Sequence, residues 1–183
     1  GIKLIGNEIL LVQHSVTTES ILSNKQIINT LKAVIKTKLN IIAISPNSDA
    51  GHKQIFNQLK FYSKKYPRLK VYENFPRSDY LGILKNVGIL VGNSSSGLIE
   101  ASYFDTPVVN IGKRQKNREY GSNLVTVSNS SVDVIFKTIN SKLGKKTHKK
   151  SFIFGKGNSS SKIVKILETI IIDSSILEKQ ISY

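Results

Sequence analysis

The segment best suited to chemistry is Val91 to Glu100, which reads VGNSSSGLIE. It follows an apolar stretch that predicts a strand, and it is expected to open a helix. Backbone N–H groups at a helix start are unpaired and the helix dipole is positive there, so a phosphate gains hydrogen bonds from them and from serine hydroxyls. Glu100 is placed to accept hydrogen bonds from a vicinal diol such as ribose. The ordinary alternative is a plain N-cap on a surface helix, because Ser-rich turns are common.

Three further segments place polar side chains just after predicted strands. His14 is suited to hold a phosphate or transfer a proton near neutral pH, Asn47 and Asp49 occupy the next strand end, and Arg114 and Arg118 could reach a diphosphate with planar guanidinium groups. Each has an ordinary alternative, namely a structural His, an Asp-capped turn and a solvated basic loop. Because all four segments follow strands, we expect them to meet at one edge of a sheet, where open α/β sheets bind ligands.

Short β-branched apolar runs alternate with segments of helical period, which predicts an α/β fold with a parallel sheet. The expected strands are Ile9 to Gln13, Asn40 to Ile44, Lys70 to Tyr72, Gly88 to Val91, Val108 to Ile111 and Leu124 to Val127. The expected helices are Ile21 to Lys38, Gly51 to Lys64, Ser78 to Asn86, one that starts near Gly97, and Ser160 to Ile172.

Finer expectations follow from the same periodicity. Ser78 is the expected cap of its helix, Lys142 to Lys156 is interpreted as a loop, and Asp173 to Tyr183 as a short helix or a frayed end. The first two helices should each bury one stripe, formed by Ile21, Ile28, Leu31 and Ile35 in the first and by Ile55, Leu59 and Tyr62 in the second.

The chain has 183 residues, with 27 Lys and Arg against 12 Asp and Glu, and a formal charge of +15. This excess favours anionic partners such as nucleic acid, anionic lipid or phosphorylated small molecules. The lack of Cys excludes a disulfide, a thiolate metal site and a Cys nucleophile. We expect no metal and no cofactor. No membrane partner is expected either, because no apolar run approaches the roughly 20 residues of a span. No secretory leader is recognisable, so a cytoplasmic protein is expected. Because Met is absent, the chain is interpreted as a fragment.

Five blocks of the sequence resemble, in order and spacing, successive blocks of the hydrolysing UDP-N-acetylglucosamine 2-epimerases: QHSVTTE, SPNSDAG, GNSSSGLIEA, PVVNIGKRQKNRE and FGKGNSSSKIVKIL. The resemblance runs from about Leu10 to Leu167 and is closest to the sialic- and legionaminic-acid branch. Members have two Rossmann-like domains in a GT-B-like architecture, with the nucleotide sugar in the cleft between them. This chain resembles only the second. The resemblance implies that residues 1–183 form one UDP-binding domain, whose helical tail at 158–183 packs on the absent first domain.

The resemblance also implies roles for single residues. The proline that commonly follows the His in the first block of the family is replaced here by Ser15. Ser96 stands where some relatives carry Cys or Gly. The implied roles are UDP contact and catalysis for His14, a place beside the nucleotide for Asn47, phosphate binding for Ser94 and Ser95, ribose binding for Glu100, a diphosphate contact for Arg114 and a backbone contact to uracil at Phe75.

In the family that this chain resembles, UDP leaves by elimination to give a 2-acetamidoglucal, and added water releases N-acetylmannosamine. The sugar partner is expected to be UDP-N-acetylglucosamine or a diacetamido analogue. The assigned acids and bases lie largely in the first domain, so this chain alone is expected to be inactive, and the longer protein is expected to be a homo-oligomer.

Two other functions are compatible with parts of the sequence. The first is the donor-binding domain of a GT-B glycosyltransferase, against which His14 and the RQKNRE block argue. The second is a basic nucleic-acid-binding module, suggested by the charge of the chain and by the cluster at Lys142 to Lys150. That module would need interleaved aromatic residues or a reading helix, which this sequence lacks, so nucleic acid is not an expected partner.

Overall fold

One six-stranded parallel sheet organises the chain. The computed structural model describes residues 2–128, 131–147 and 151–173. The strand order is β3-β2-β1-β4-β5-β6, so the connections reverse direction between the central strands β1 and β4. The strands are β1 (Ile9–Val12), β2 (Ile41–Ile44), β3 (Leu69–Tyr72), β4 (Ile89–Gly92), β5 (Val108–Ile111) and β6 (Leu124–Val127). Each lies within one residue of the strand that the sequence predicts.

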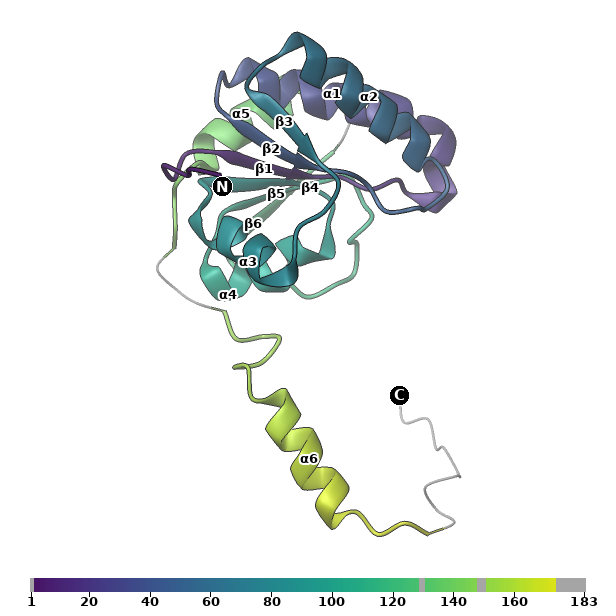
Figure 1. Ribbon diagram of the computed structural model, residues 1–183, viewed down its shortest axis with the longest axis vertical. Helices are drawn as coiled ribbons and strands as arrows, with labels where there is room; N and C mark the ends of the chain where they lie inside the picture. Colours follow the sequence, from purple (N-terminus) through teal and green to yellow (C-terminus); the bar gives the residue numbers. More distant parts are fainter. Residues whose placement is uncertain (1, 129–130, 148–150, 174–183) are drawn as a thin grey trace. The chain divides into compact units, whose positions relative to one another are not determined.

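Helices cover both faces of the sheet, as Figure 1 shows. On one face α1 (Ser23–Lys36), α2 (His52–Lys65) and α5 (Val132–Lys142) pack against the strands, and on the other lie α3 (Arg77–Asn86) and α4 (Glu100–Phe104). Successive strand residues point to opposite faces, so Leu11 joins the first core and Leu10 the second. The expected Rossmann-like α/β fold with helices on both faces is confirmed.

The first helix begins later than the sequence predicts. Residues Thr17–Leu22 form a 3₁₀ helix, η1, in which Glu19 takes a non-helical conformation (φ −128°, ψ 25°). This kink shifts the helical phase, so Ile21 is 92% exposed, and its expected place on the buried stripe was wrong. Leu31 is buried as expected and Ile35 packs against the core, and the other large buried side chains of α1 are Ile27 and Val34. In α2 the expected stripe is confirmed, with Ile55 and Leu59 buried and Tyr62 packed against them.

Two helix starts differ from expectation. Ser78 is not the cap of α3, because the helix already begins at Arg77 after Pro76, whose ring fixes a φ of −50° that suits a helix entry. The helix expected near Gly97 begins at Glu100. A 3₁₀ turn, η2 (Ser95–Gly97), precedes it, because Ser94 Oγ accepts a hydrogen bond from the Ser96 N–H and closes a tight turn.

Helix α5 was missed by the sequence analysis. Its signals are present: Ser131 Oγ caps the helix by accepting from the Val134 N–H, and Ile135 and Ile139 are spaced to lie buried on one face. The loop expected after Lys142 follows α5, and residues 148–150 of it lie outside the described residues.

The chain divides into two compact units, Gly1–Ile153 and Phe154–Tyr183. The second contains α6 (Ser159–Thr169), which starts within one residue of its predicted start. It ends three residues early because Ile170 takes an extended conformation (φ −70°, ψ 132°). Ile163, Ile166 and Leu167 share one side of α6. Residues 174–183 lie outside the described part, so the expectation for that tail stays a prediction. No helix in the described ranges is long and apolar enough to cross a membrane.

Candidate functional site

Asn93, the residue after β4, joins the ends of three strands. Its side chain is buried, its Oδ1 accepts a hydrogen bond from the His14 N–H at 2.7 Å, and its Nδ2 donates to the His14 carbonyl at 2.8 Å. The Asn93 carbonyl accepts from Gln115 Nε2 at 2.8 Å and from Arg114 Nη1 at 3.2 Å. The loops after β1, β4 and β5 are therefore held together at the point where the strand order reverses. No local sequence pattern singles out Asn93, whose partner His14 lies 79 residues away.

Two glycines make this close approach possible. Gly92 ends β4 with φ +136°, and a Cβ at this position would lie 2.0 Å from the Val12 carbonyl oxygen. No other residue type fits there without moving β1 or β4. A Cβ on Gly97 would lie 3.0 Å from Val108 Cγ1, so the serine turn rests directly on the sheet.

His14 is held in one tautomer. Its Nδ1 accepts a hydrogen bond from the Asn47 backbone N–H at 3.2 Å, which leaves the proton on Nε2. Burial lowers the pKa of His14 from its ordinary value, and the nearby Arg114 charge lowers it further. The imidazole is therefore neutral near pH 7 and can donate a hydrogen bond through Nε2.

Arg114 and Asp49 bring the loop after β2 into the same network. Asn47 Nδ2 donates to Asp49 Oδ2 at 2.8 Å, and the same oxygen lies 3.8 Å from Arg114 Nη2. A cavity of about 380 Å³ lies here, lined by residues 15–18, Asp49, Lys113 and Arg114. Arg118, on the same loop as Arg114, is exposed and lines a separate depression of about 250 Å³.

The serine turn offers hydrogen-bond donors to an anion. Ser94 Oγ lies 3.0 Å from Ser96 Oγ and accepts from the Ser96 N–H at 3.3 Å. Within the described residues, no hydrogen bond uses the backbone N–H of Ser94 or Ser95. The donors expected at a helix start thus lie in a 3₁₀ turn, since α4 is only five residues long, and anion binding there stays a prediction.

Glu100 retains an unused acceptor. Its Oε1 lies 3.6 Å from Arg77 Nη1. Its Oε2 is buried, and in the part of the chain that the structure describes it has no hydrogen-bond partner. A buried, unpaired carboxylate oxygen has free capacity for a ligand hydroxyl.

Phe75 lies in the loop between β3 and α3, apart from the hydrogen-bonded network. Its ring packs against Tyr72, with centroids 4.9 Å apart, and against the core under α3 and α4. Of the predicted site residues, the structure brings His14, Asn47 and Arg114 into one network. The backbone contact to uracil expected at Phe75 stays a prediction. Within residues 2–128, 131–147 and 151–173, no three His, Asp or Glu side chains cluster to hold a metal ion.

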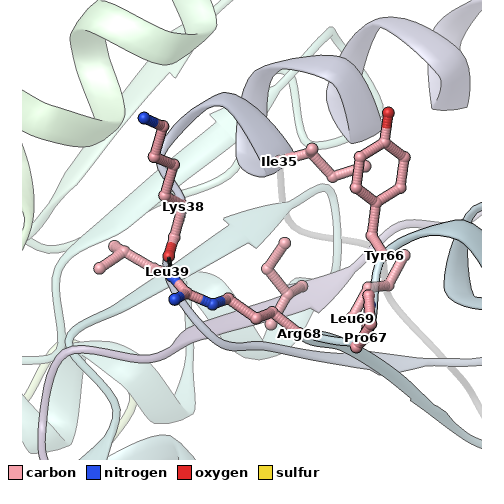
Figure 2. Close-up of a pocket in the computed structure, with 8 residues that line it drawn as sticks. Ile35, Lys38, Leu39, Tyr66, Pro67, Arg68 and Leu69 are labelled. Atoms are coloured by element: carbon pink, nitrogen blue, oxygen red, sulfur yellow. Dashed lines mark hydrogen bonds between the residues drawn. The ribbon is translucent and has the colours of Figure 1, made fainter.

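A larger cavity, of about 440 Å³, lies at the opposite edge of the sheet (Figure 2). Its lining is mainly apolar and comes from the loops that enter β2 and β3, with Ile35 and Tyr66 on one side and Leu39 and Leu69 among its walls. The Arg68 guanidinium donates to the Lys38 carbonyl across it. None of the predicted site residues lines this cavity.

The strand order, with its reversal between β1 and β4, defines a Rossmann-like α/β domain. The sequence profile of the UDP-N-acetylglucosamine 2-epimerases matches residues 3–168, and the chain belongs to this family. It is 34% identical over 174 residues to the Legionella pneumophila UDP-N,N'-diacetylbacillosamine 2-epimerase (hydrolyzing), an alignment that covers 95% of this chain. That alignment covers 46% of the relative, so the chain spans about half its length.

Solved structures show the same fold at low identity. The Methanocaldococcus jannaschii UDP-GlcNAc 2-epimerase, in complex with UDP-GlcNAc and UDP, matches with a TM-score of 0.66 at 18% identity, covering 90% of this chain and 46% of that one. The Escherichia coli heptosyltransferase with ADP matches with a TM-score of 0.53 at 11% identity, covering 75% of this chain and 44% of that one. At these identities the likeness extends to the fold alone.

Proposed function

We propose that this chain is the UDP-binding, C-terminal half of a hydrolysing 2-epimerase that acts on UDP-N-acetylglucosamine or a diacetamido analogue. The proposal places the protein in the cytoplasm, in amino-sugar metabolism of the sialic-acid type, and as a homo-oligomer whose 158–183 tail packs on the first domain. Family membership and the named activity of the Legionella relative support the reaction class.

The observation that carries the proposal is the convergence of polar groups at the β1–β4 reversal point. Asn93 fixes the backbone of His14 and, through its carbonyl, the Arg114 guanidinium. A cation, a neutral imidazole donor and the N–H groups of Ser94 and Ser95, which have no partner among the described residues, then lie at the same end of the sheet. This combination suits a diphosphate better than any neutral ligand.

In this mechanism the chain stabilises the leaving group. As the bond from the sugar C1 to the diphosphate oxygen breaks, the electron pair goes to UDP, and negative charge builds on the diphosphate. Arg114 and the serine turn supply donors there, and His14 Nε2–H supplies one more. Glu100 Oε2 accepts from the ribose hydroxyls. Removal of the C2 proton, and the addition of water to the glucal, are assigned to groups of the other half.

Calorimetric titration of this chain with UDP tests the proposal. We expect weak binding, because one wall of the cleft is present. Arg114→Ala should weaken it by about 1.5–3 kcal/mol, the cost of a lost charge-assisted hydrogen bond. Arg118→Ala is the matched control, since it removes the same charge from the same loop at an exposed position. If the two variants weaken UDP binding equally, Arg114 contributes only through the net charge of the chain and makes no specific contact with UDP.

The assignment of Glu100 has its own test. Glu100→Gln should weaken UDP binding and leave pyrophosphate binding unchanged, because the proposed partner of the carboxylate is the ribose. An equal loss of affinity for UDP and for pyrophosphate would mean that Glu100 acts on the diphosphate and not on the ribose.

A further inference from the structure

Helix α3 places one tyrosine against the serine turn. The Tyr80 hydroxyl is hydrogen-bonded to Ser96 Oγ, and the Tyr80 ring packs against the core under α3 and α4. Burial raises the pKa of Tyr80, so its hydroxyl keeps its proton near neutral pH. Tyr80 is not among the site residues predicted from the sequence.

The hydroxyl contacts continue from Tyr80 to the proposed phosphate site. Ser96 Oγ lies 3.0 Å from Ser94 Oγ, which also accepts from the Ser96 N–H. A serine hydroxyl has one proton and two acceptor lone pairs. Either oxygen of each pair can be the donor. In the arrangement in which Tyr80 donates to Ser96 and Ser96 donates to Ser94, the two lone pairs of Ser94 Oγ are filled by the Ser96 N–H and O–H.

Only the proton of Ser94 then remains for a further partner. With both lone pairs occupied, the Ser94 hydroxyl cannot accept from anything else and is left to donate. A phosphate oxygen is an acceptor, so this orientation favours an anion over a neutral donor. Chains of hydrogen bonds that polarise one another also strengthen the last donor.

We propose that Tyr80 is a positioning residue that acts through Ser96 to set the Ser94 hydroxyl as a donor to the diphosphate. The inference rests on the proposed function, since it assumes that UDP is the ligand at the serine turn. Tyr80 touches no reacting atom in this account, and its effect passes through two hydroxyls.

Calorimetric titration of UDP into the 183-residue chain and its variants tests this relay, meaning the hydroxyl contacts that run from Tyr80 through Ser96 to Ser94. Tyr80→Phe keeps the ring and removes the hydroxyl, and it should raise the Kd for UDP about three- to ten-fold, the range for one neutral hydrogen bond. Tyr66→Phe is the matched control, because it removes a tyrosine hydroxyl at the opposite edge of the sheet and should leave the Kd unchanged.

If Tyr80 acts through Ser96 and Ser94, the losses of UDP affinity in the single variants should not add in the double variants. If Tyr80 is merely structural, they should add. In a Ser96→Ala or Ser94→Ala background, Tyr80→Phe should cause no further loss of UDP affinity, because the chain of donors is already broken. Losses that add in both backgrounds would overturn the inference. Should Tyr80→Phe fail to fold, as judged by thermal melting, Ser96→Ala alone must still raise the Kd, and an unchanged value would count against the relay.

The two proposals fail in different ways. If the parent chain and Tyr66→Phe do not bind UDP, the proposed function is wrong and the relay falls with it. If the parent binds UDP and Arg114→Ala weakens binding while Tyr80→Phe does not, only the role of Tyr80 is overturned.

Discussion

At the scale of single residues, His14 shows how the fold selects one state of a side chain. Its Nδ1 faces a backbone N–H, and its surroundings combine burial with the Arg114 cation. Both favour the neutral form. A neutral imidazole with its proton on Nε2 is a hydrogen-bond donor to a ligand, and the fold provides this donor without a charged His.

The His14 environment predicts a pH dependence of stability. In the unfolded chain His14 takes up a proton near its ordinary pKa of 6.5, and in the folded chain only at lower pH. Between these values the unfolded state binds more protons, so the free energy of unfolding falls as the pH drops below about 6.5. Urea unfolding at pH 7.5 and 5.5 should show a larger loss for the parent than for His14→Gln. A loss of the same size in both would exclude His14 as its source.

Ser15 and Asn93 are both buried polar side chains, but only Asn93 is satisfied. In the described structure Ser15 Oγ has no hydrogen-bond partner, while Asn93 makes two bonds to the His14 backbone. Ser15→Ala should therefore be neutral or stabilise the chain by up to about 1 kcal/mol, and Asn93→Ala should cost about 2–4 kcal/mol. Chemical denaturation measures both, and a clear loss for Ser15→Ala would indicate an unrecognised partner.

At the scale of elements, the turn out of β4 depends on a glycine that touches β1. Gly92→Ala should destabilise the chain by more than about 3 kcal/mol, because the new Cβ meets the Val12 carbonyl at 2.0 Å in a positive-φ conformation. Gly82→Ala is the control. It lies in α3 with open space around its Cβ, and should stabilise by about 0.5–1 kcal/mol. Thermal melts in which Gly92→Ala behaves like Gly82→Ala would contradict this geometry.

The strands could be predicted because buried parallel strands are short apolar runs bounded by turn residues. Helix starts could not be predicted as well, since the kink at Glu19 and the 3₁₀ turn at Ser95 depend on local hydrogen bonds and packing. Among the residues of the candidate site, His14 and Arg114 could be predicted because each follows the end of a predicted strand. Asn93 and Tyr80 escaped notice because their partners lie 79 and 16 residues away in sequence, and only the fold brings them together.

At the scale of the whole molecule, the proposed function gives this chain one wall of a cleft. Its carboxylates at the candidate site are few, with Asp49 engaged by Asn47 and Glu100 assigned to ribose. A base must lie within about 3 Å of the proton it removes, or act through one water, and the site must exclude solvent.

The isolated chain should therefore not release UDP from UDP-N-acetylglucosamine. A coupled assay for free UDP measures this directly, with a bacterial hydrolysing 2-epimerase as the positive control. Sustained turnover by the 183-residue chain would show that it carries its own base, and would overturn the assignment of proton abstraction to another half.

The most direct test of the account is to locate UDP on the chain. In a ¹⁵N-labelled sample titrated with UDP, the backbone amide signals of His14, Ser94, Ser95 and Arg114 should shift and saturate together. The amides of Tyr66 and Leu69, at the opposite edge, should not move. The account would be contradicted by the absence of saturable shifts, or by shifts confined to that opposite edge.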